Sequence, residues 1–212
     1  LRSRRRSGAN DRIRVGLIGG GGMGRGDLQT FLANPEVDCP IVCDVDDRQA
    51  ARAQVLVEDI RETKPDMVRD LDAVIVATPD HWHALPTVLA CQAGKDVYVE
   101  KPLATSIAEG RAMLEAVKRH GRVVQMGTQW RSGEHFREAV EFVRSGKLGK
   151  IRFVRCWAYH DWLGAIGNPP DGDPPPYVDY DMWLGPAPKR PFNPNRFHFQ
   201  FRWFWDYAGG LM

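Results

Sequence analysis

The first half of the chain alternates short apolar runs with longer helix-like segments. The apolar runs lie at residues 13–19, 37–43, 73–77, 97–99 and 123–126. Helix patterns lie between them, at residues 23–32, 46–62, 84–93 and 106–120. This alternation is typical of a parallel sheet covered on both faces, because parallel strands need crossover connections. The sequence therefore predicts an α/β fold with a doubly wound parallel sheet.

The interval between Asp46 and Asp72 holds one helix pattern and no clear apolar strand. Doubly wound sheets of this kind usually place an edge strand in this interval. Two interpretations stay open: residues 66–68 form a short vestigial strand, or the sheet lacks a strand at this edge.

The pattern changes after residue 126. Residues 134–145 predict an amphipathic helix, and residues 151–159 alternate in a way that predicts a half-buried strand. Proline and glycine dominate residues 164–194, and aromatic side chains crowd residues 197–207. We therefore expect an incomplete α+β domain after the parallel sheet.

Composition excludes several classes of protein. The 29 Lys and Arg residues nearly balance the 27 Asp and Glu residues, which gives no nucleic-acid footprint. No apolar stretch approaches the roughly 20 residues that span a bilayer. The four cysteines contain no C-x-x-C pair, so we expect no metal site and no disulfide framework, but reduced cysteines in the core.

Adjacent arginines at positions 4–6 raise the question of a twin-arginine export signal. Such a signal needs an apolar segment after the arginines, whereas residues 7–11 read Ser-Gly-Ala-Asn-Asp. We expect residues 1–12 to be a disordered basic tail and the protein to be cytoplasmic. Export is the alternative, if the arginines are the remnant of such a signal.

A glycine cluster follows the first apolar run directly and opens the first helix pattern. Gly19, Gly21 and Gly24 satisfy G-x-G-x-x-G. In this motif the first glycine makes a tight turn, the second lets a pyrophosphate approach the backbone, and the third lets the helix pack on the strand. The amide groups here, with Gly22 and Met23 included, and the helix dipole are then expected to hold the anion.

An acidic residue about twenty positions further on completes the dinucleotide-binding pattern. Asp44 lies there, at the end of the second apolar run, and its carboxylate can accept hydrogen bonds from the adenosine ribose. A carboxylate repels a 2′-phosphate and so favours NAD, while Arg48 keeps NADP possible. We therefore expect an NAD(P)-binding Rossmann domain over residues 13–128.

Two later apolar runs also end in unusual residues, within VATPDHWHA and VYVEKPLA. Ligands of doubly wound sheets bind outside the carboxyl ends of the strands, although a plain polar loop would also fit these positions. Together with VGLIGGGGMG, the two motifs resemble the Gfo/Idh/MocA oxidoreductases, which include glucose–fructose oxidoreductase and inositol dehydrogenase. VQMGTQWR, GKLGKIRFV and FWDYAGG extend the likeness to the end of the chain.

The resemblance implies hydride transfer to or from a sugar or polyol carbon. It implies that Lys101 contacts the substrate hydroxyl and assists proton transfer, often beside a cis Lys–Pro bond. It also implies a C-terminal domain, here residues 129–212, that covers the substrate and mediates oligomerisation. Cofactor contacts are implied for the residues of the two motifs, namely Thr78, Pro79, His83, Glu100 and Lys101. Trp130 either stacks near the nicotinamide or is a buried core residue.

Relatives usually continue past the Gly-Gly with a helix that carries an aspartate and a histidine of the substrate site. This sequence ends at Met212 before such a helix, and neither His160 nor His198 matches that histidine. His198 lies in FHFQFRW, whose alternation predicts a strand or an interface position. We therefore expect a member of the family that is truncated at its C-terminus.

The leading hypothesis is an NAD(P)-dependent oxidoreductase that acts on a hydroxyl of a small sugar or polyol. One alternative is an NAD-dependent glycosidase of the same family. Another is a catalytically inactive dinucleotide-binding remnant. We expect no nucleic-acid partner, no membrane span and, for the full-length form, a homo-oligomer.

Overall fold

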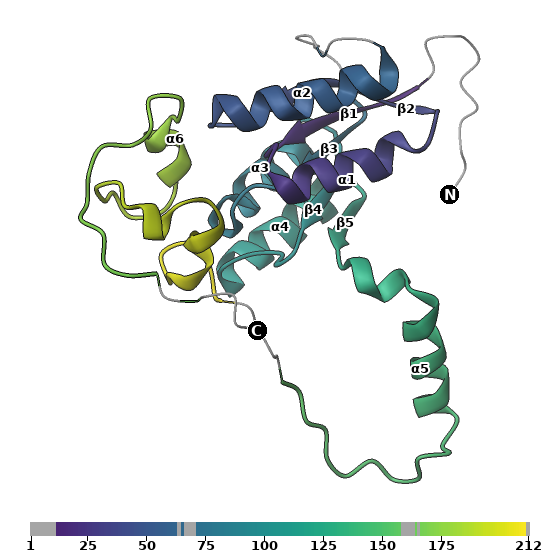
Figure 1. Ribbon diagram of the computed structural model, residues 1–212. Helices are drawn as coiled ribbons and strands as arrows, with labels where there is room; N and C mark the ends of the chain where they lie inside the picture. The colour runs from purple at the N-terminus through teal and green to yellow at the C-terminus, as the bar shows by residue number, and fades with distance from the viewer. Residues whose placement is uncertain (1–11, 63–64, 66–70, 158–163, 165, 211–212) are drawn as a thin grey trace.

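A parallel five-stranded sheet forms the centre of the molecule (Figure 1). The computed structural model describes residues 12–62, 65, 71–157, 164 and 166–210. The strands are β1 (Ile13–Ile18), β2 (Val37–Cys43), β3 (Ala73–Val76), β4 (Asp96–Glu100) and β5 (Val124–Gly127). They lie in the order β2-β1-β3-β4-β5. The doubly wound parallel sheet expected from the sequence is thus confirmed.

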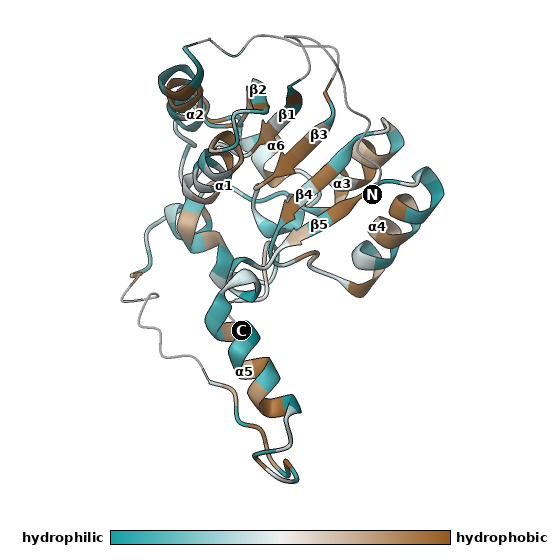
Figure 2. Cartoon of the chain, turned by 90° about the vertical axis from the view of Figure 1, so that its right-hand side faces the viewer, coloured by the Kyte–Doolittle hydropathy of each residue, from teal (hydrophilic) through white to brown (hydrophobic). Residues whose placement is uncertain are grey.

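Four helices cover the two faces of this sheet. They are α1 (Gly22–Leu32), α2 (Asp47–Arg61), α3 (Ala84–Gln92) and α4 (Ile107–His120). Leu17 and Ile75 pack with α1 and α2 in one apolar cluster. Val76 and Val99 belong to a second cluster, with α3 and α4. Both faces are therefore apolar, and Figure 2 shows the hydrophobic strands between the helices.

Local signals in the sequence set the helix ends. Asp46 caps α2, where its side chain accepts hydrogen bonds from the amides of Arg48 and Gln49. Ser106 and Glu109 form a capping box at the start of α4, which satisfies amides that have no partner within the helix. Because these caps fix where each helix begins, they also fix the loops at the carboxyl ends of the strands.

Within the described residues, β2 forms one edge of the sheet. Pro40 lies inside β2, and proline is tolerated at an edge because its missing N–H removes no central ladder bond. The pairing of β1 with β2 shifts register between Arg14 and Gly16, opposite this part of β2. Residues 66–68, considered for a vestigial strand, lie outside the described residues.

The chain leaves the sheet after β5. The short turn η2 (Gln129–Ser132) leads to α5 (Glu134–Arg144), which extends away from the sheet (Figure 1). The predicted helix is present, and all its residues are at least partly exposed. The strand predicted at residues 151–159 is wrong as far as residue 157, because residues 151–157 are exposed and irregular. A strand needs a neighbour for its backbone groups, and none pairs with this segment in the described chain.

The C-terminal segment forms a separate aromatic cluster. It contains α6 (Tyr180–Leu184) and the turns η3 (Pro194–Arg196) and η4 (His198–Trp203). The rings of Trp183, Phe197 and Tyr207 pack together. The strand predicted for FHFQFRW is wrong, since these residues form the end of a turn and η4. The alternating aromatic side chains pack within a small cluster of turns and not on the face of a sheet.

All four cysteines are free. Cys39 and Cys91 are buried, as the sequence predicts. The same expectation is wrong for Cys43 and Cys156, which are exposed, because one ends the edge strand β2 and the other lies in the irregular exposed segment. Among the described residues, no helix has the length and apolar character to cross a membrane. The predicted basic tail lies outside the described residues, apart from Arg12.

Candidate functional site

The glycine cluster forms the junction between β1 and α1. Gly19 has φ +95, and a Cβ there would lie 2.5 Å from the carbonyl oxygen of Ala77. A Cβ on Gly24 would collide with the carbonyl oxygen of Gly19. These two positions therefore require glycine, one for the turn and one for the close approach of helix and strand.

The space at the middle of this junction is open. Within the part of the chain that the structure describes, no heavy atom comes within 4 Å of a Cβ built on Gly21 or Gly22. Gly21 is the N-cap of α1 and has no side chain to bond the first amides of the helix. Those amides, with that of the exposed Met23, and the positive end of the helix dipole form a cradle for an anion.

Asp44 lies directly against this cradle. Its Oδ2 accepts a hydrogen bond from the amide of Gly20 at 2.6 Å, and its Oδ1 accepts one from the amide of Asp46 at 2.9 Å. Burial raises the pKa of Asp44, although both amide contacts lower it. Two carboxylate oxygens offer about four acceptor positions, so Asp44 can still accept hydrogen bonds from the hydroxyls of a ribose.

The loop after β3 contains the predicted residues Thr78, Pro79 and His83. Thr78 Oγ1 is buried and has no hydrogen-bond partner among the described residues, as fits a hydroxyl that bonds to a ligand. His83 is 1% exposed. Its Nδ1 lies 2.5 Å from the carbonyl oxygen of Pro102, and its Nε2 lies 3.0 Å from that of Thr78. His83 therefore connects two loops, and its contact with a cofactor stays a prediction.

The loop after β4 contains Glu100 and Lys101. Glu100 is buried at 4% exposure, and its Oε2 accepts a 3.3 Å hydrogen bond from the amide of Lys101. The Lys101–Pro102 bond is cis, as the resemblance implies. Lys101 is exposed at the end of β4, whereas Asp44 follows the end of β2, on the other side of β1. A cofactor that crosses the strand ends can therefore meet both residues.

Trp130 lies in η2, beyond the end of β5. Its side chain is 67% exposed, so the interpretation as a buried core residue is wrong. Its ring contacts that of His135, 6.2 Å away. The chain leaves the sheet at this point, which places Trp130 outside both apolar clusters. Its stacking near a nicotinamide stays a prediction.

The structure adds contacts that pattern reasoning missed. His198 Nε2 lies 3.0 Å from Oδ2 of the buried Asp46, and the guanidinium of Arg48 lies 3.6 Å above the ring of Tyr177. These contacts attach the C-terminal segment beside the end of β2. An acidic residue before a helix is a cap signal, which marks Asp46, but no sequence pattern indicates its distant partner. No sequence pattern marked Asp27 either, a partly buried aspartate within α1.

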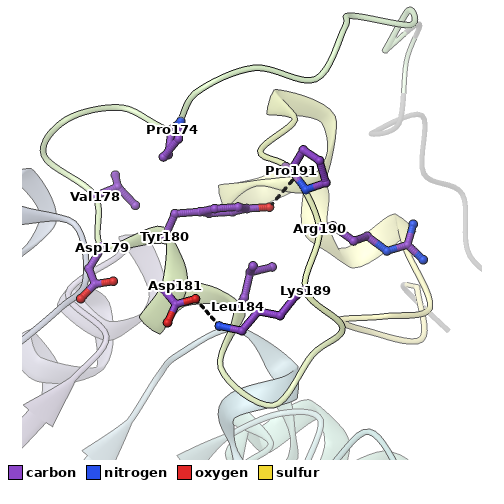
Figure 3. Close-up of a pocket in the computed structure, with 9 residues that line it drawn as sticks. All are labelled: Pro174, Val178, Asp179, Tyr180, Asp181, Leu184, Lys189, Arg190 and Pro191. Atoms are coloured by element: carbon purple, nitrogen blue, oxygen red, sulfur yellow. Dashed lines mark hydrogen bonds and ion pairs between the residues drawn. The ribbon is translucent and has the colours of Figure 1, made fainter.

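A surface pocket of about 550 Å³ lies on the C-terminal segment (Figure 3). Tyr180 lies across it and donates a hydrogen bond to the carbonyl oxygen of Pro191 at 3.2 Å. Burial raises the pKa of Tyr180 to about 12. Lys189 forms an ion pair with Asp181. Because these polar groups already bond within the pocket wall, we place the candidate site at the strand ends instead.

Comparison with known protein families decides the affiliation. Residues 13–128 match the Gfo/Idh/MocA description "oxidoreductase family, NAD-binding Rossmann fold", and residues 150–212 match the "C-terminal alpha/beta domain" of the same family. The chain belongs to the Gfo/Idh/MocA oxidoreductases. Its sheet is accordingly an NAD(P)-binding Rossmann fold, in which the junction at Gly19–Gly24 takes the position of the phosphate-binding turn.

Characterised relatives support this affiliation. The chain is 30% identical to levoglucosan dehydrogenase of Pseudarthrobacter phenanthrenivorans, over 74% of this chain and 43% of that protein. It is 35% identical to inositol 2-dehydrogenase of Rubrobacter xylanophilus, over 71% of this chain and 45% of that protein. The chain thus spans less than half the length of these relatives.

A solved structure agrees with them in fold. GenD2 from gentamicin A biosynthesis, crystallised in complex with NAD, superposes with a TM-score of 0.57 at 28% identity. The match covers 67% of this chain and 42% of GenD2. This family, like the fold, was expected from the sequence motifs and is now established.

Proposed function

We propose that this chain binds NAD in a dehydrogenase that acts on a hydroxyl group of a sugar or polyol. The observation that carries the proposal is the open glycine cradle, with Asp44 on one side and Lys101 on the other. The orphaned hydroxyl of Thr78 adds a polar group along the same strand ends. The related levoglucosan and inositol dehydrogenases support the substrate class.

Two features of the site support NAD over NADP. The Asp44 carboxylate can accept hydrogen bonds from the adenosine ribose of NAD, and its negative charge repels the 2′-phosphate of NADP. Arg48 was the residue that kept NADP possible, but its guanidinium stacks on Tyr177. A cation held over an aromatic ring is less free to turn toward a phosphate.

In this proposal the bound nicotinamide supplies the hydride chemistry. The cradle holds the diphosphate through backbone amides, and Asp44 holds the ribose. Lys101 contacts the substrate hydroxyl and carries its proton as the carbon–hydrogen bond is broken or made. His83 fixes the position of the Lys101–Pro102 turn through the carbonyl oxygen of Pro102.

Cofactor titration tests the proposal directly. We expect NADH to quench tryptophan fluorescence and to bind at least about tenfold more tightly than NADPH, which corresponds to about 1.4 kcal/mol. Asp44→Ala should weaken NADH binding and reduce the difference in affinity between NADH and NADPH. Asp47→Asn is the matched control, because Asp47 is an exposed carboxylate three residues away. Absence of NADH binding at millimolar concentration would overturn the proposal.

The reaction itself is tested with the full-length protein. NADH formation with a panel of polyols and sugars is the expected result. Release of sugar from a glycoside without net NADH would identify the glycosidase alternative, and binding without either reaction would identify an inactive nucleotide-binding remnant. Both outcomes would contradict the dehydrogenase assignment.

We also propose that the full-length protein is a homo-oligomer. The exposed helix α5 supports this, because Phe136, Val140 and Val143 remain 41–46% exposed along it, and hydrophobic residues are visible on it in Figure 2. Apolar side chains gathered on one helix face favour association. Sedimentation of the full-length protein as a monomer at micromolar concentration would refute this.

A further inference from the structure

Asp27 lies on α1, on the side of the helix that covers β4 near its carboxyl end. One helical turn after it, Phe31 packs its ring edge-on against Tyr98 of β4, with centroids 5.3 Å apart. Tyr98 and Glu100 are two residues apart on β4, so both side chains face α1. Asp27 precedes Phe31 by four residues on the same face of α1. The helix therefore brings a second carboxyl group toward Glu100.

Both carboxyl groups have an oxygen without a partner. Asp27 Oδ2 and Glu100 Oε1 are buried and accept no hydrogen bond within the described residues. Glu100 Oε1 and the Tyr98 hydroxyl lie close to Gly127 of β5, where any side chain would collide with them. Burying a charged carboxylate without a partner costs free energy. Protonation of one of the two carboxyls removes one buried negative charge and so lowers this cost.

The electrostatics agree with a held proton. Burial, followed by the negative charge of Glu100, raises the pKa of Asp27 from 3.8 to about 7. Burial also raises the pKa of Glu100. Two interacting carboxyls titrate as a pair and not as separate residues.

Other charged groups also face the pair. Lys101 favours the ionised form of both carboxyls, and His83 and Asp80 act on Glu100 in opposite directions. The Tyr98 hydroxyl has its pKa raised, mainly by burial and also by both carboxyls. Titration near neutrality is therefore expected to centre on the carboxyl pair.

We propose that Asp27 and Glu100 together hold one proton, carried by one carboxyl while the other is ionised, and that this protonation responds to the oxidation state of the cofactor. The inference rests on the proposed function, because it places the nicotinamide end beside Lys101 at the end of β4. The oxidised nicotinamide ring is cationic and the reduced ring is neutral. A nearby cation favours ionised carboxyls. When NAD⁺ binds, the pair loses its proton to solvent and becomes doubly negative; when NADH binds, the pair keeps it.

This exchange makes affinity depend on pH for one cofactor form only. Because NAD⁺ binding releases a proton, NAD⁺ affinity rises with pH while the pair is protonated, by at most about tenfold per pH unit. NADH affinity stays flat over the same range. Asp27 is a positioning residue in this account, acting through Glu100 and Lys101 and not by contact with substrate.

Calorimetry of cofactor binding tests the inference without turnover. Titrations of the whole chain at pH 7 in PIPES and in Tris, which differ in ionisation enthalpy, measure the protons released. Because a carboxyl with a pKa of about 7 is half protonated at pH 7, we expect up to about half a proton released per NAD⁺ and close to none per NADH. Asp27→Asn should abolish the release, while the exposed control Asp47→Asn should keep it. Glu100→Gln is the second variant if Asp27→Asn does not fold.

The outcomes separate the two proposals. Equal proton release for NAD⁺ and NADH, or unchanged release in a folded Asp27→Asn or Glu100→Gln variant, overturns the carboxyl pair while cofactor binding stands. Failure of the unmodified chain to bind either cofactor overturns the proposed function and the inference with it. An infrared band of a protonated carboxyl at pH 6, lost in Asp27→Asn, would support the pair independently of any cofactor.

Discussion

Alanine substitutions in the glycine cluster should separate folding from cofactor binding. A Cβ on Gly24 meets the carbonyl oxygen of Gly19, and it also lies 3.2 Å from the Cβ of Ala77. The first contact is with backbone, so α1 must move away from β1. Overpacking of this kind costs about 1–3 kcal/mol, and we expect Gly24→Ala to fall at the upper end.

Gly22→Ala is the matched variant. A side chain at Gly22 meets no heavy atom of the described chain within 4 Å, and alanine is favoured over glycine inside a helix by up to about 1 kcal/mol. The free energy of unfolding should therefore stay equal or rise slightly. The added methyl group instead occupies the cradle, and we expect NADH affinity to fall by about tenfold or more.

Urea unfolding followed by tryptophan fluorescence measures the first effect, and NADH titration measures the second. With a urea m-value of about 2 kcal/mol/M, a loss of about 3 kcal/mol should lower the midpoint of Gly24→Ala by about 1.5 M. A Gly24→Ala protein as stable as its parent would refute the packing argument. A Gly22→Ala protein that binds NADH with unchanged affinity would refute the anion cradle.

Three further predictions concern the surroundings of the site. His83→Ala leaves two carbonyl oxygens without their shared partner and should lower the free energy of unfolding by about 1–3 kcal/mol, measured by urea titration against the parent chain. Gly185→Ala places a Cβ against the ring of Trp82 at φ +46, so the C-terminal segment should become more sensitive to limited proteolysis; an unchanged cleavage pattern would contradict this. Because the pKa of Asp27 is raised, the folded state binds more protons than the unfolded state between pH 3.8 and about 7, so stability should fall as pH rises through this window. Asp27→Asn should flatten that dependence in denaturation curves recorded from pH 4 to pH 8, whereas an equally steep curve would exclude this carboxyl as its source.

The sheet was predictable because its signals are local. Each strand is a short apolar run, and Asp46 and Ser106 are recognisable caps directly before their helices. The glycine spacing likewise marks the turn between β1 and α1. The wrong strand predictions fall after β5, where alternation at residues 151–157 and in FHFQFRW suggested strands. Alternation predicts a strand only if a neighbouring strand exists, and no local pattern supplies that neighbour.

The candidate site was predictable only in part. Asp44, Thr78 and Lys101 follow strands whose carboxyl ends meet at one edge of the sheet, so their approximate positions follow from topology. The environment of Asp27 does not, because an aspartate within a helix has no distinguishing spacing. Its raised pKa depends on burial and on the charge of Glu100, which belongs to a strand far along the chain.

The aromatic cluster of the C-terminal segment has a practical consequence for anyone dividing this protein into parts. The carbonyl oxygen of Trp183 accepts a hydrogen bond from the indole of Trp82 and lies 2.9 Å from His81 Nε2, while the backbone of Asp179 bonds to Val45. Ending the chain after β5 would remove the aromatic cluster from the Rossmann domain and expose the side chains, such as His81, that pack against it. The two parts matched by separate family descriptions should therefore be kept together when the protein is prepared for measurement.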